Sequence, residues 1–296
     1  MRHMKIKTFC PGHITGFFQI CEHREPLRSG SRGAGLCVGL GANSTVEIEE
    51  GNGEVFIRID GEESNAPVTI AAVSKIIEDR RLDVTVDARL DLPIGQGFGM
   101  SAAGALSAAH GVSELLGMPF RVALRAAHEA ELESHTGLGD VAALSRGGMT
   151  FRRVEGLPPF GRIDRINAEP DVVLSVVGGP LPTAEVLHDE KRRQKINAMG
   201  KECVSKMALS PTMATLMRLS REFMTRTGLA TPEVEEAVKA AEEYGPASMA
   251  MLGNSVFAVG KAKDQDRVLS ERGTTFRTKV DWRGPRVIAG EPESYD

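Results

Sequence analysis

The 296-residue chain lacks several features that would assign it to a common class of protein. No apolar run is long enough to cross a membrane, and residues 1–10 carry too much charge for a signal peptide. The four cysteines show no C-x-x-C spacing, and the seven histidines form no metal-ligand motif. We therefore expect a cytoplasmic protein with reduced cysteines and no membrane partner.

The chain also lacks an excess of positive charge. It has 36 Lys and Arg residues against 40 Asp and Glu residues, a net charge of −4, which argues against nucleic acid as its partner. Apolar residues make up 41% of the chain, and no internal repeat or flexible linker is visible. This length and composition allow one large domain or two lobes with an ample core.

The most informative stretch lies between a predicted strand at residues 82–92 and an alanine-rich helix that opens at Ser101. Three glycines precede the helix at alternate positions: Gly95, Gly97 and Gly99. Glycines let the backbone approach a ligand closely, and a helix start presents free N–H groups and partial positive charge. These features predict a phosphate site, although a strand-to-helix turn could need glycines for its bends alone. The position of the glycines directly before the helix favours phosphate.

Two common phosphate loops do not fit this stretch. A Walker A loop ends in G-K-[ST], whereas Gly99 is followed by Met100 and Ser101, so the loop has no lysine. The dinucleotide fingerprint G-x-G-x-x-G would need glycine in place of Met100. The protein-kinase loop lies between two strands rather than before a helix.

The stretch resembles the second motif of the GHMP kinases, P-x-G-x-G-L-G-S-S-A, with Phe98 in place of leucine and Met100 in place of the first serine. The resemblance implies that the loop binds ATP and that Ser101 offers its hydroxyl to a Mg²⁺ ion on the phosphates. The implied ATP-binding residues are Pro93, Gly95, Gln96, Gly97, Phe98, Gly99, Met100, Ser101 and Ala102.

The other two motifs of that family are degenerate here. Residues 5–10 are expected to form a short strand that turns at Pro11-Gly12-His13, similar to a first motif P-G-R-x-x-L-x-G-E-H. The third motif, K-T-G-A-G-x-G-G before a strand, should fall at residues 247–255, where one glycine is kept. We assign only weak site roles to this third segment.

A predicted helix at residues 119–135 supplies the first acidic candidate. On a helical wheel Glu131 falls on the apolar face with His128, whereas Glu129 falls on the opposite, solvated face. A buried carboxylate needs a metal, a histidine or an arginine, so Glu131 is either a metal ligand or part of a salt bridge. Together with the phosphate loop we favour the metal, and keep Glu129 as the alternative ligand.

The second acidic candidate is Asp140, which follows a glycine-containing turn. GHMP kinases commonly place an aspartate there, before a Gly-Gly pair and a strand, and Gly147-Gly148 with a strand at 149–154 completes the pattern. In members that use a catalytic base, this aspartate takes the role. The alternative for Asp140 is a helix cap for residues 141–144.

The resemblance spans nearly the whole chain and implies an α+β, two-lobed GHMP kinase fold. The expected lobes are an ATP-binding, ribosomal-protein-S5-like lobe at 1–156 and a ferredoxin-like lobe at 157–296, which includes a helical region at 183–200. The chain's own form of the motifs looks most like the archaeal pantoate kinases, which use ATP and Mg²⁺ to phosphorylate the primary hydroxyl of pantoate to 4-phosphopantoate in coenzyme A biosynthesis.

This implied acceptor carries a carboxylate, for which the chain offers cations and polar donors. The candidates for substrate binding are Ser31, Arg32, His128 and Arg152. Arg153 should point to the other face of the same strand. Two alternatives stay open, a GHMP kinase for another small alcohol such as homoserine or mevalonate and a non-catalytic nucleotide-binding module. The sequence also leaves a monomer and a homodimer open.

Overall fold

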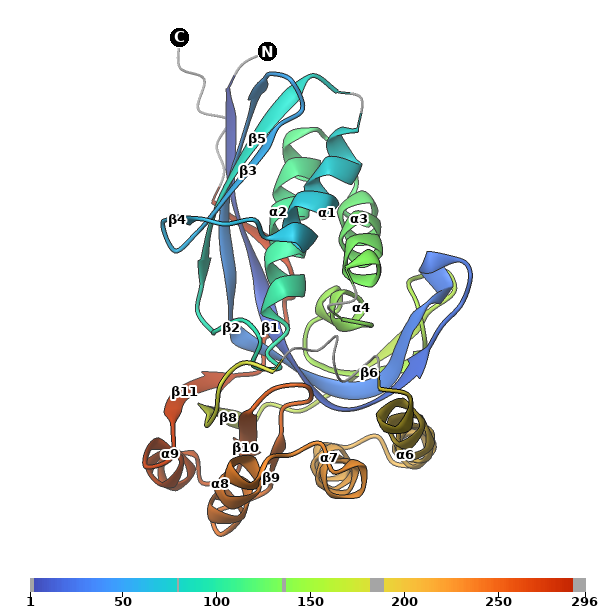
Figure 1. The fold of residues 1–296 in the computed structure, drawn as a ribbon, viewed down its shortest axis with the longest axis vertical. Helices are drawn as coiled ribbons and strands as arrows, with labels where there is room; N and C mark the ends of the chain where they lie inside the picture. Colours follow the sequence, from blue (N-terminus) through green and yellow to red (C-terminus); the bar gives the residue numbers. More distant parts are fainter. Residues whose placement is uncertain (1–2, 79, 135–136, 182–188, 290–296) are drawn as a thin grey trace.

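A computed structural model of the chain describes residues 3–78, 80–134, 137–181 and 189–289. The fold is α+β, as expected, with two sheets that each carry helices on one side (Figure 1). None of the helices within these ranges has the length and apolar character that a bilayer span requires.

The larger sheet has eight strands in the order β12-β1-β2-β5-β3-β4, with β6 pairing to both β2 and β7. Its strands are β1 (Met4–Cys21), β2 (Gly30–Glu50), β3 (Val55–Ile59), β4 (Glu62–Glu63), β5 (Leu82–Leu90), β6 (Met149–Val154), β7 (Arg162–Ile166) and β12 (Arg286–Ala289). Every pair is antiparallel except β3 with β5.

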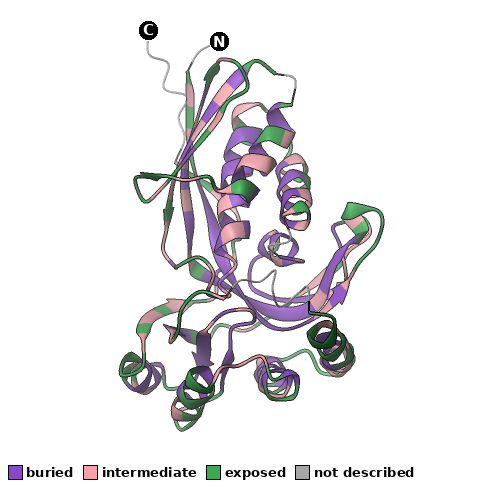
Figure 2. Ribbon diagram, in the orientation of Figure 1, coloured by how far each residue is buried: buried purple, intermediate pink, exposed green. Residues whose placement is uncertain are grey.

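β1 corrects one expectation, because the chain does not turn at Pro11-Gly12-His13. The strand continues through these residues and shifts its register against β2 between Pro11 and Gly12. A β-bulge of this kind accommodates a proline, which cannot donate a ladder hydrogen bond. The β1–β2 ribbon therefore curves in one piece, and Figure 2 shows that it is buried along most of its length. As a result His13 lies inside the protein.

Three helices cover one face of the larger sheet: α1 (Pro67–Ile77), α2 (Met100–Leu115) and α3 (Phe120–Glu133) (Figure 1). α2 begins one residue before the predicted start and is buried on most sides. Its small residues permit close packing, since a Cβ atom on Gly111 would meet Val46 of β2 at 2.6 Å. The short helix α4 (Asp140–Leu144) lies below these three.

The smaller sheet has the antiparallel order β11-β8-β10-β9. Its strands are β8 (Asp171–Val176), β9 (Ala247–Met249), β10 (Ser255–Val259) and β11 (Thr274–Lys279). Helices α6 (Glu190–Leu209), α7 (Met213–Thr227), α8 (Pro232–Glu242) and α9 (Ala262–Ser270) lie in a row along it (Figure 1). α6 and α7 also pack against β1, where a Cβ atom on Gly16 would contact Leu216 at 3.1 Å. The curved ribbon thus joins the two layers.

The expected helical region at 183–200 is described only in part, since residues 183–188 lie outside the described ranges. α6 begins at Glu190 after Asp189, whose carboxylate caps it by accepting the N–H groups of Lys191 and Arg192. The lobe boundary after residue 156 stays a prediction: β7 pairs with β6 and β12 pairs with β1, both in the larger sheet.

Candidate active site

The glycine loop has the backbone that a phosphate site needs. Gly95, Gly97 and Gly99 all have positive φ, at 77°, 73° and 64°. Gly99 caps α2, and the first helical hydrogen bond runs from the N–H of Ala103 to its carbonyl. The N–H groups of the three residues before Ala103 therefore have no partner within the helix, and they present an anion site at the positive end of the helix dipole.

The loop is held from the side of the smaller sheet. Gln96 accepts a hydrogen bond from the Ser255 hydroxyl at 2.6 Å and donates from Nε2 to the Gly178 carbonyl at 3.0 Å. A Cβ atom on Gly97 would lie 2.8 Å from the Met251 carbonyl. The Gln96 side chain thus faces away from the helix start, and Gln96, like Pro93, is not among the residues that line the adjoining cavity.

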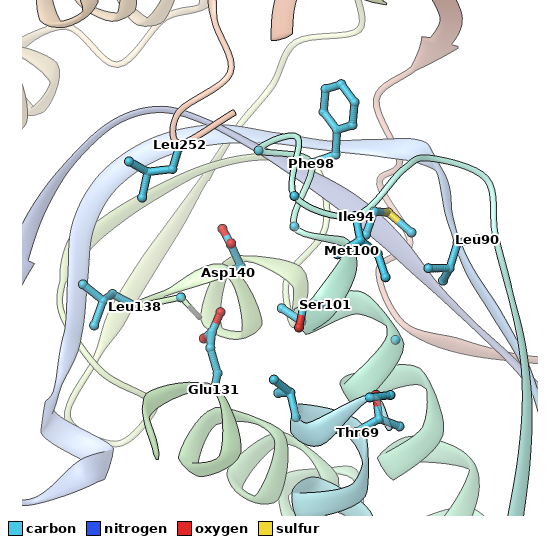
Figure 3. A pocket seen from close by; sticks show the side chains of 18 of the residues that line it. Thr69, Leu90, Ile94, Phe98, Met100, Ser101, Glu131, Leu138, Asp140 and Leu252 are labelled. Atoms are coloured by element: carbon cyan, nitrogen blue, oxygen red, sulfur yellow. The ribbon is translucent and has the colours of Figure 1, made fainter. Parts of the chain in front are cut away.

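A cavity of about 520 Å³ opens beside this loop (Figure 3). Most of the predicted site residues line it, namely Ser31, Gly95, Gly97, Phe98, Gly99, Met100, Ser101, Ala102, Glu131, Asp140 and Arg152. The cavity has an apolar end and an acidic end, with the start of α2 between them.

The apolar end comes from segments that the sequence did not single out. Ile57 and Ile59 of β3, the segment 64–69 at the start of α1, and Leu90 of β5 line it. Ser64 and Asn65 add polar groups to this end. An apolar slot with a few polar groups suits a flat heteroaromatic ring such as a nucleotide base.

Glu131 lies at the acidic end and is 1% exposed. Backbone N–H groups of Asp140 and Val141 bond to its carboxyl, but Oε2 has no hydrogen-bond partner among the described residues. Burial, reinforced by the nearby Asp140 charge, raises the pKa of Glu131 to about 8. An ionised Glu131 therefore needs a cation, and Mg²⁺, which takes oxygen ligands and keeps several of its waters, fits this orphaned oxygen and the Ser101 hydroxyl in the same cavity.

Glu129, the alternative ligand, lies outside that cavity. It pairs with Arg125 at 2.7 Å and stands 4.0 Å from Lys75. The wheel thus predicted the buried position of Glu131 correctly, whereas Glu129, predicted on a solvated face, has only 17% of its side chain exposed.

Asp140 is the first residue of α4, but its carboxylate makes no cap bond to the helix. It accepts instead from Nδ1 of His13 at 2.7 Å and from the Thr15 hydroxyl at 3.5 Å, and 28% of its side chain is exposed. Burial alone would raise the pKa of Asp140, but the His13 hydrogen bond and the Arg152 charge hold that pKa below its usual value. The aspartate is therefore a fixed, ionised group at the cavity wall.

Arg152 sets the tautomer of His13. Its NH1 group lies 3.4 Å from Nε2 of His13, and since a guanidinium can only donate, Nε2 must carry the lone pair and Nδ1 the proton. Complete burial, aided by the Arg152 charge, lowers the pKa of His13. The imidazole is thus neutral, with one N–H directed at Asp140.

Two of the four residues predicted to bind the substrate line the cavity, and two do not. Arg152 and Ser31 line the acidic end, Arg152 is 2% exposed, and its Nε has no partner among the described residues. His128 is fully buried and contacts the Pro26 carbonyl at 3.2 Å, and Arg32 pairs with Glu155 at 3.2 Å. Neither of these two is among the cavity-lining residues. Arg153 pairs with Asp164 on the other face of β6, as its position predicted.

The degenerate third segment reaches the cavity through Met251 and Leu252. The Met251 N–H donates to the Thr15 carbonyl at 3.0 Å, so this turn adjoins the acidic end. Leu252 has φ 64°, a left-handed conformation that costs a residue other than glycine roughly 1–2 kcal/mol. Neither position stood out in the sequence beyond its place in the segment.

A glycine loop at a helix start, beside an orphaned glutamate and a fixed aspartate, offers the groups that phosphoryl transfer uses. Family comparison agrees: residues 68–148 match the GHMP kinases N terminal domain and residues 208–277 match the GHMP kinases C terminal domain. The chain belongs to the GHMP kinase family.

Two curated relatives and one solved structure refine the comparison. The chain is 34% identical to the pantoate kinase of Methanocaldococcus jannaschii, over 88% of this chain and 95% of the relative. It is 32% identical to the pantoate kinase of Methanospirillum hungatei, over 99% and 100%. A solved structure described as a phosphotransferase related to the CoA biosynthesis pathway superposes with a TM-score of 0.87, at 32% identity over 96% of this chain and 98% of the other.

Proposed function

We propose that this protein is an ATP-dependent pantoate kinase, which transfers the γ-phosphoryl group of ATP to the primary hydroxyl of pantoate and forms 4-phosphopantoate for coenzyme A biosynthesis. One observation carries the proposal: the glycine loop, Glu131 and Asp140 line the same 520 Å³ cavity. The similarity to pantoate kinases over nearly the whole chain supports this acceptor over other alcohols.

ATP occupies the cavity with its phosphates on the backbone amides between Gly95 and Ala102. The apolar end, lined by Ile57, Ile59 and Leu90, takes the base. Because the loop has no lysine, the helix start and a metal ion must neutralise the phosphate charge.

Ser101 and Glu131 would hold a Mg²⁺ ion, whose charge neutralises the β- and γ-phosphates. The raised pKa of Glu131 and its unpartnered Oε2 support this role. The ion would in turn stabilise the ionised form of Glu131, because a buried carboxylate charge is costly without a cation beside it.

Asp140 orients the acceptor hydroxyl and receives its proton. His13 and Thr15 engage Oδ1, which leaves Oδ2 as the oxygen that faces the acceptor. A carboxylate with a low pKa is a weak base, but phosphoryl transfer needs little help from proton removal before the O–P bond forms. Positioning of the hydroxyl is therefore the larger contribution of Asp140.

Arg152 and Ser31 anchor the carboxylate of pantoate. Arg152 brings a buried positive charge to the cavity wall next to Gly139, where an added Cβ would lie 3.2 Å from Nε. A guanidinium binds a carboxylate with two parallel hydrogen bonds and so fixes the orientation of the acceptor.

An acceptor panel tests the proposal. ADP release is followed with ATP, Mg²⁺ and each of pantoate, homoserine and mevalonate, and the product is identified by phosphorus NMR. Pantoate should give by far the highest kcat/KM. A preference for homoserine or mevalonate would replace the acceptor, and ATP binding without any ADP release would indicate a non-catalytic nucleotide-binding module.

We further propose a cytoplasmic location and a division into lobes after residue 156. The free cysteines Cys10, Cys21, Cys37 and Cys203 support a reducing compartment. The homodimer stays a prediction, and analytical ultracentrifugation distinguishes it from a monomer.

A further inference from the structure

The acidic end of the cavity carries apolar side chains that neither ATP nor a metal requires. Phe18, Leu138, Met251 and Leu252 all line the cavity, and Leu138 and Leu252 lie at its acidic end. Leu138 precedes Asp140 by two residues, and Met251 bonds to Thr15, which itself bonds to Asp140. Figure 3 shows Leu138 and Leu252 on the same side as Glu131 and Asp140, away from Thr69 and Leu90. These leucines therefore face whatever molecule Asp140 acts on.

Leu252 is the most informative of these residues because its backbone is strained. Its φ of 64° belongs to the region that glycine adopts freely, and the chain has glycine at the next position, Gly253. Strain that persists at a cavity wall suggests that the side chain itself is needed there. The side chain of Leu252 is only partly buried in the core and contributes to the cavity surface.

Pantoate differs from other small hydroxy acids beside its reacting group. The carbon bonded to its hydroxymethyl group carries two methyl groups, whereas in homoserine and mevalonate the same position is an unbranched methylene. With the hydroxyl at Asp140, these methyl groups must lie against the nearest wall of the cavity. That wall is apolar where Leu138 and Leu252 line it.

We propose that Leu252, together with Leu138, forms the subsite for the geminal methyl groups of the acceptor and so determines its specificity. This inference rests on the proposed pantoate kinase function. The residue before Leu252, Met251, contacts both sides of the cavity. Its carbonyl adjoins Gly97 of the glycine loop, and its N–H bonds to Thr15, which bonds to Asp140. The left-handed turn therefore places Leu252 between the loop and Asp140.

The test compares kcat/KM for pantoate with kcat/KM for 2,4-dihydroxybutyrate, which is pantoate without the two methyl groups. Wild-type protein should prefer pantoate by roughly 10²-fold, since each methyl group lost from an apolar pocket lowers the rate about tenfold or more. Leu252→Gly keeps the backbone conformation and removes the wall. Its preference should fall to about threefold or less, with the KM for ATP unchanged.

Ile94→Ala is the matched control, because Ile94 lines the cavity near its apolar end and is half-exposed. It should raise the KM for ATP and leave the ratio between the two acceptors as in wild type. Leu252→Asn is a second variant that tolerates the left-handed backbone, keeps the approximate volume and makes the wall polar. It should also lower the preference.

The outcomes separate the two proposals. A wild-type protein that phosphorylates neither acceptor would contradict the pantoate kinase function. A wild-type protein that prefers pantoate, with variants that keep the full preference, would overturn the role of Leu252 alone. Melting temperatures of both variants close to wild type would show that a changed ratio comes from the subsite rather than from unfolding.

Discussion

His13 donates a hydrogen bond from Nδ1 to Oδ1 of Asp140 across 2.7 Å, although 127 positions separate the two residues in the chain. His13 is fully buried in β1, and Arg152 fixes its tautomer from the other side. The orientation of the proposed base thus depends on a residue of the first strand.

Replacing His13 should impair turnover more than binding. His13→Leu removes the donor to Asp140, and we expect kcat to fall about 10²-fold because the carboxylate loses its orientation, with the KM for ATP nearly unchanged. His13→Asn keeps an N–H donor close to the position of Nδ1 and should recover part of the activity. His110→Gln, a buried histidine on α2 that bonds to Glu114 outside the cavity, is the control and should leave kcat near wild type. Equal losses for His13→Leu and His13→Asn would argue against the positioning role.

Asp140→Asn should lower kcat by about 10²–10⁴-fold and leave ATP affinity nearly intact, because the amide neither orients the acceptor hydroxyl as the carboxylate does nor receives its proton. Steady-state kinetics and nucleotide titration measure the two effects. Asp164→Asn, which breaks the ion pairs to Arg153 and Arg162, is the matched control outside the cavity. Near-normal turnover of Asp140→Asn would refute the base assignment.

The two helix glutamates should differ in their effect on metal dependence. Glu131→Gln removes the charge at the cavity, so a higher Mg²⁺ concentration should be needed for half-maximal activity and kcat should fall. Glu129→Gln removes only the pairs with Arg125 and Lys75 and should leave both values close to wild type. A Mg²⁺ titration of initial rates checks this. The opposite order would assign the ligand to Glu129.

Two glycines, Gly97 in the glycine loop and Gly117 after α2, separate the effect of backbone strain from the effect of a close contact. Gly97 and Gly117 have similar φ, 73° and 65°, but an added Cβ would lie 2.8 Å from a carbonyl at Gly97 and meet nothing within 4 Å at Gly117. Gly117→Ala should cost roughly 1–2 kcal/mol of stability and leave ATP affinity unchanged. Gly97→Ala should cost more and also weaken ATP binding, since the loop must move away from Met251. Denaturant unfolding and nucleotide titration give both quantities, and equal effects of the two variants would show that the contact is unimportant.

Local patterns in the sequence predicted the parts of the site that depend on local structure. Gly95, Gly97 and Gly99 precede a helix start, and the backbone freedom that glycine gives was enough to predict a phosphate loop there; all three have positive φ. The helical wheel placed Glu131 inward, where the structure has it, but it placed Glu129 on a solvated face, although only 17% of that side chain is exposed. It also placed His128 inward, correctly, but a wheel gives a face and not a partner, and His128 meets the Pro26 carbonyl.

The parts that the sequence missed depend on contacts between distant segments. Pro11-Gly12-His13 reads as a turn, and only pairing with β2 keeps β1 extended and brings His13 to Asp140. The apolar end combines β3, β5 and the start of α1, whose residues have no motif of their own. The role proposed for Leu252 could not be predicted for a further reason. It depends on a positive φ, which leucine does not normally adopt and which the sequence therefore gives no reason to expect.

Asp83 holds the turn between β2 and β3. Its Oδ1 accepts the backbone N–H groups of Asn52, Gly53 and Glu54 at 2.7, 3.0 and 2.9 Å, and these bonds, that from Glu54 foremost, lower the pKa of Asp83 below its usual value. A carboxyl with a lower pKa in the folded state stabilises the fold above its unfolded pKa, about 3.9, and loses that contribution as the pH falls through the folded value. The Asp83→Asn variant should therefore have a lower melting temperature than wild type at neutral pH, and the difference should shrink as the pH falls below about 4.

The control is Asp87→Asn, which removes one exposed ion pair to Arg58 and should change stability by less than about 1 kcal/mol. Thermal unfolding from pH 2.5 to 7 measures both, and a difference for Asp83→Asn that stays constant over this range would mean that the ionised carboxylate does not hold the turn.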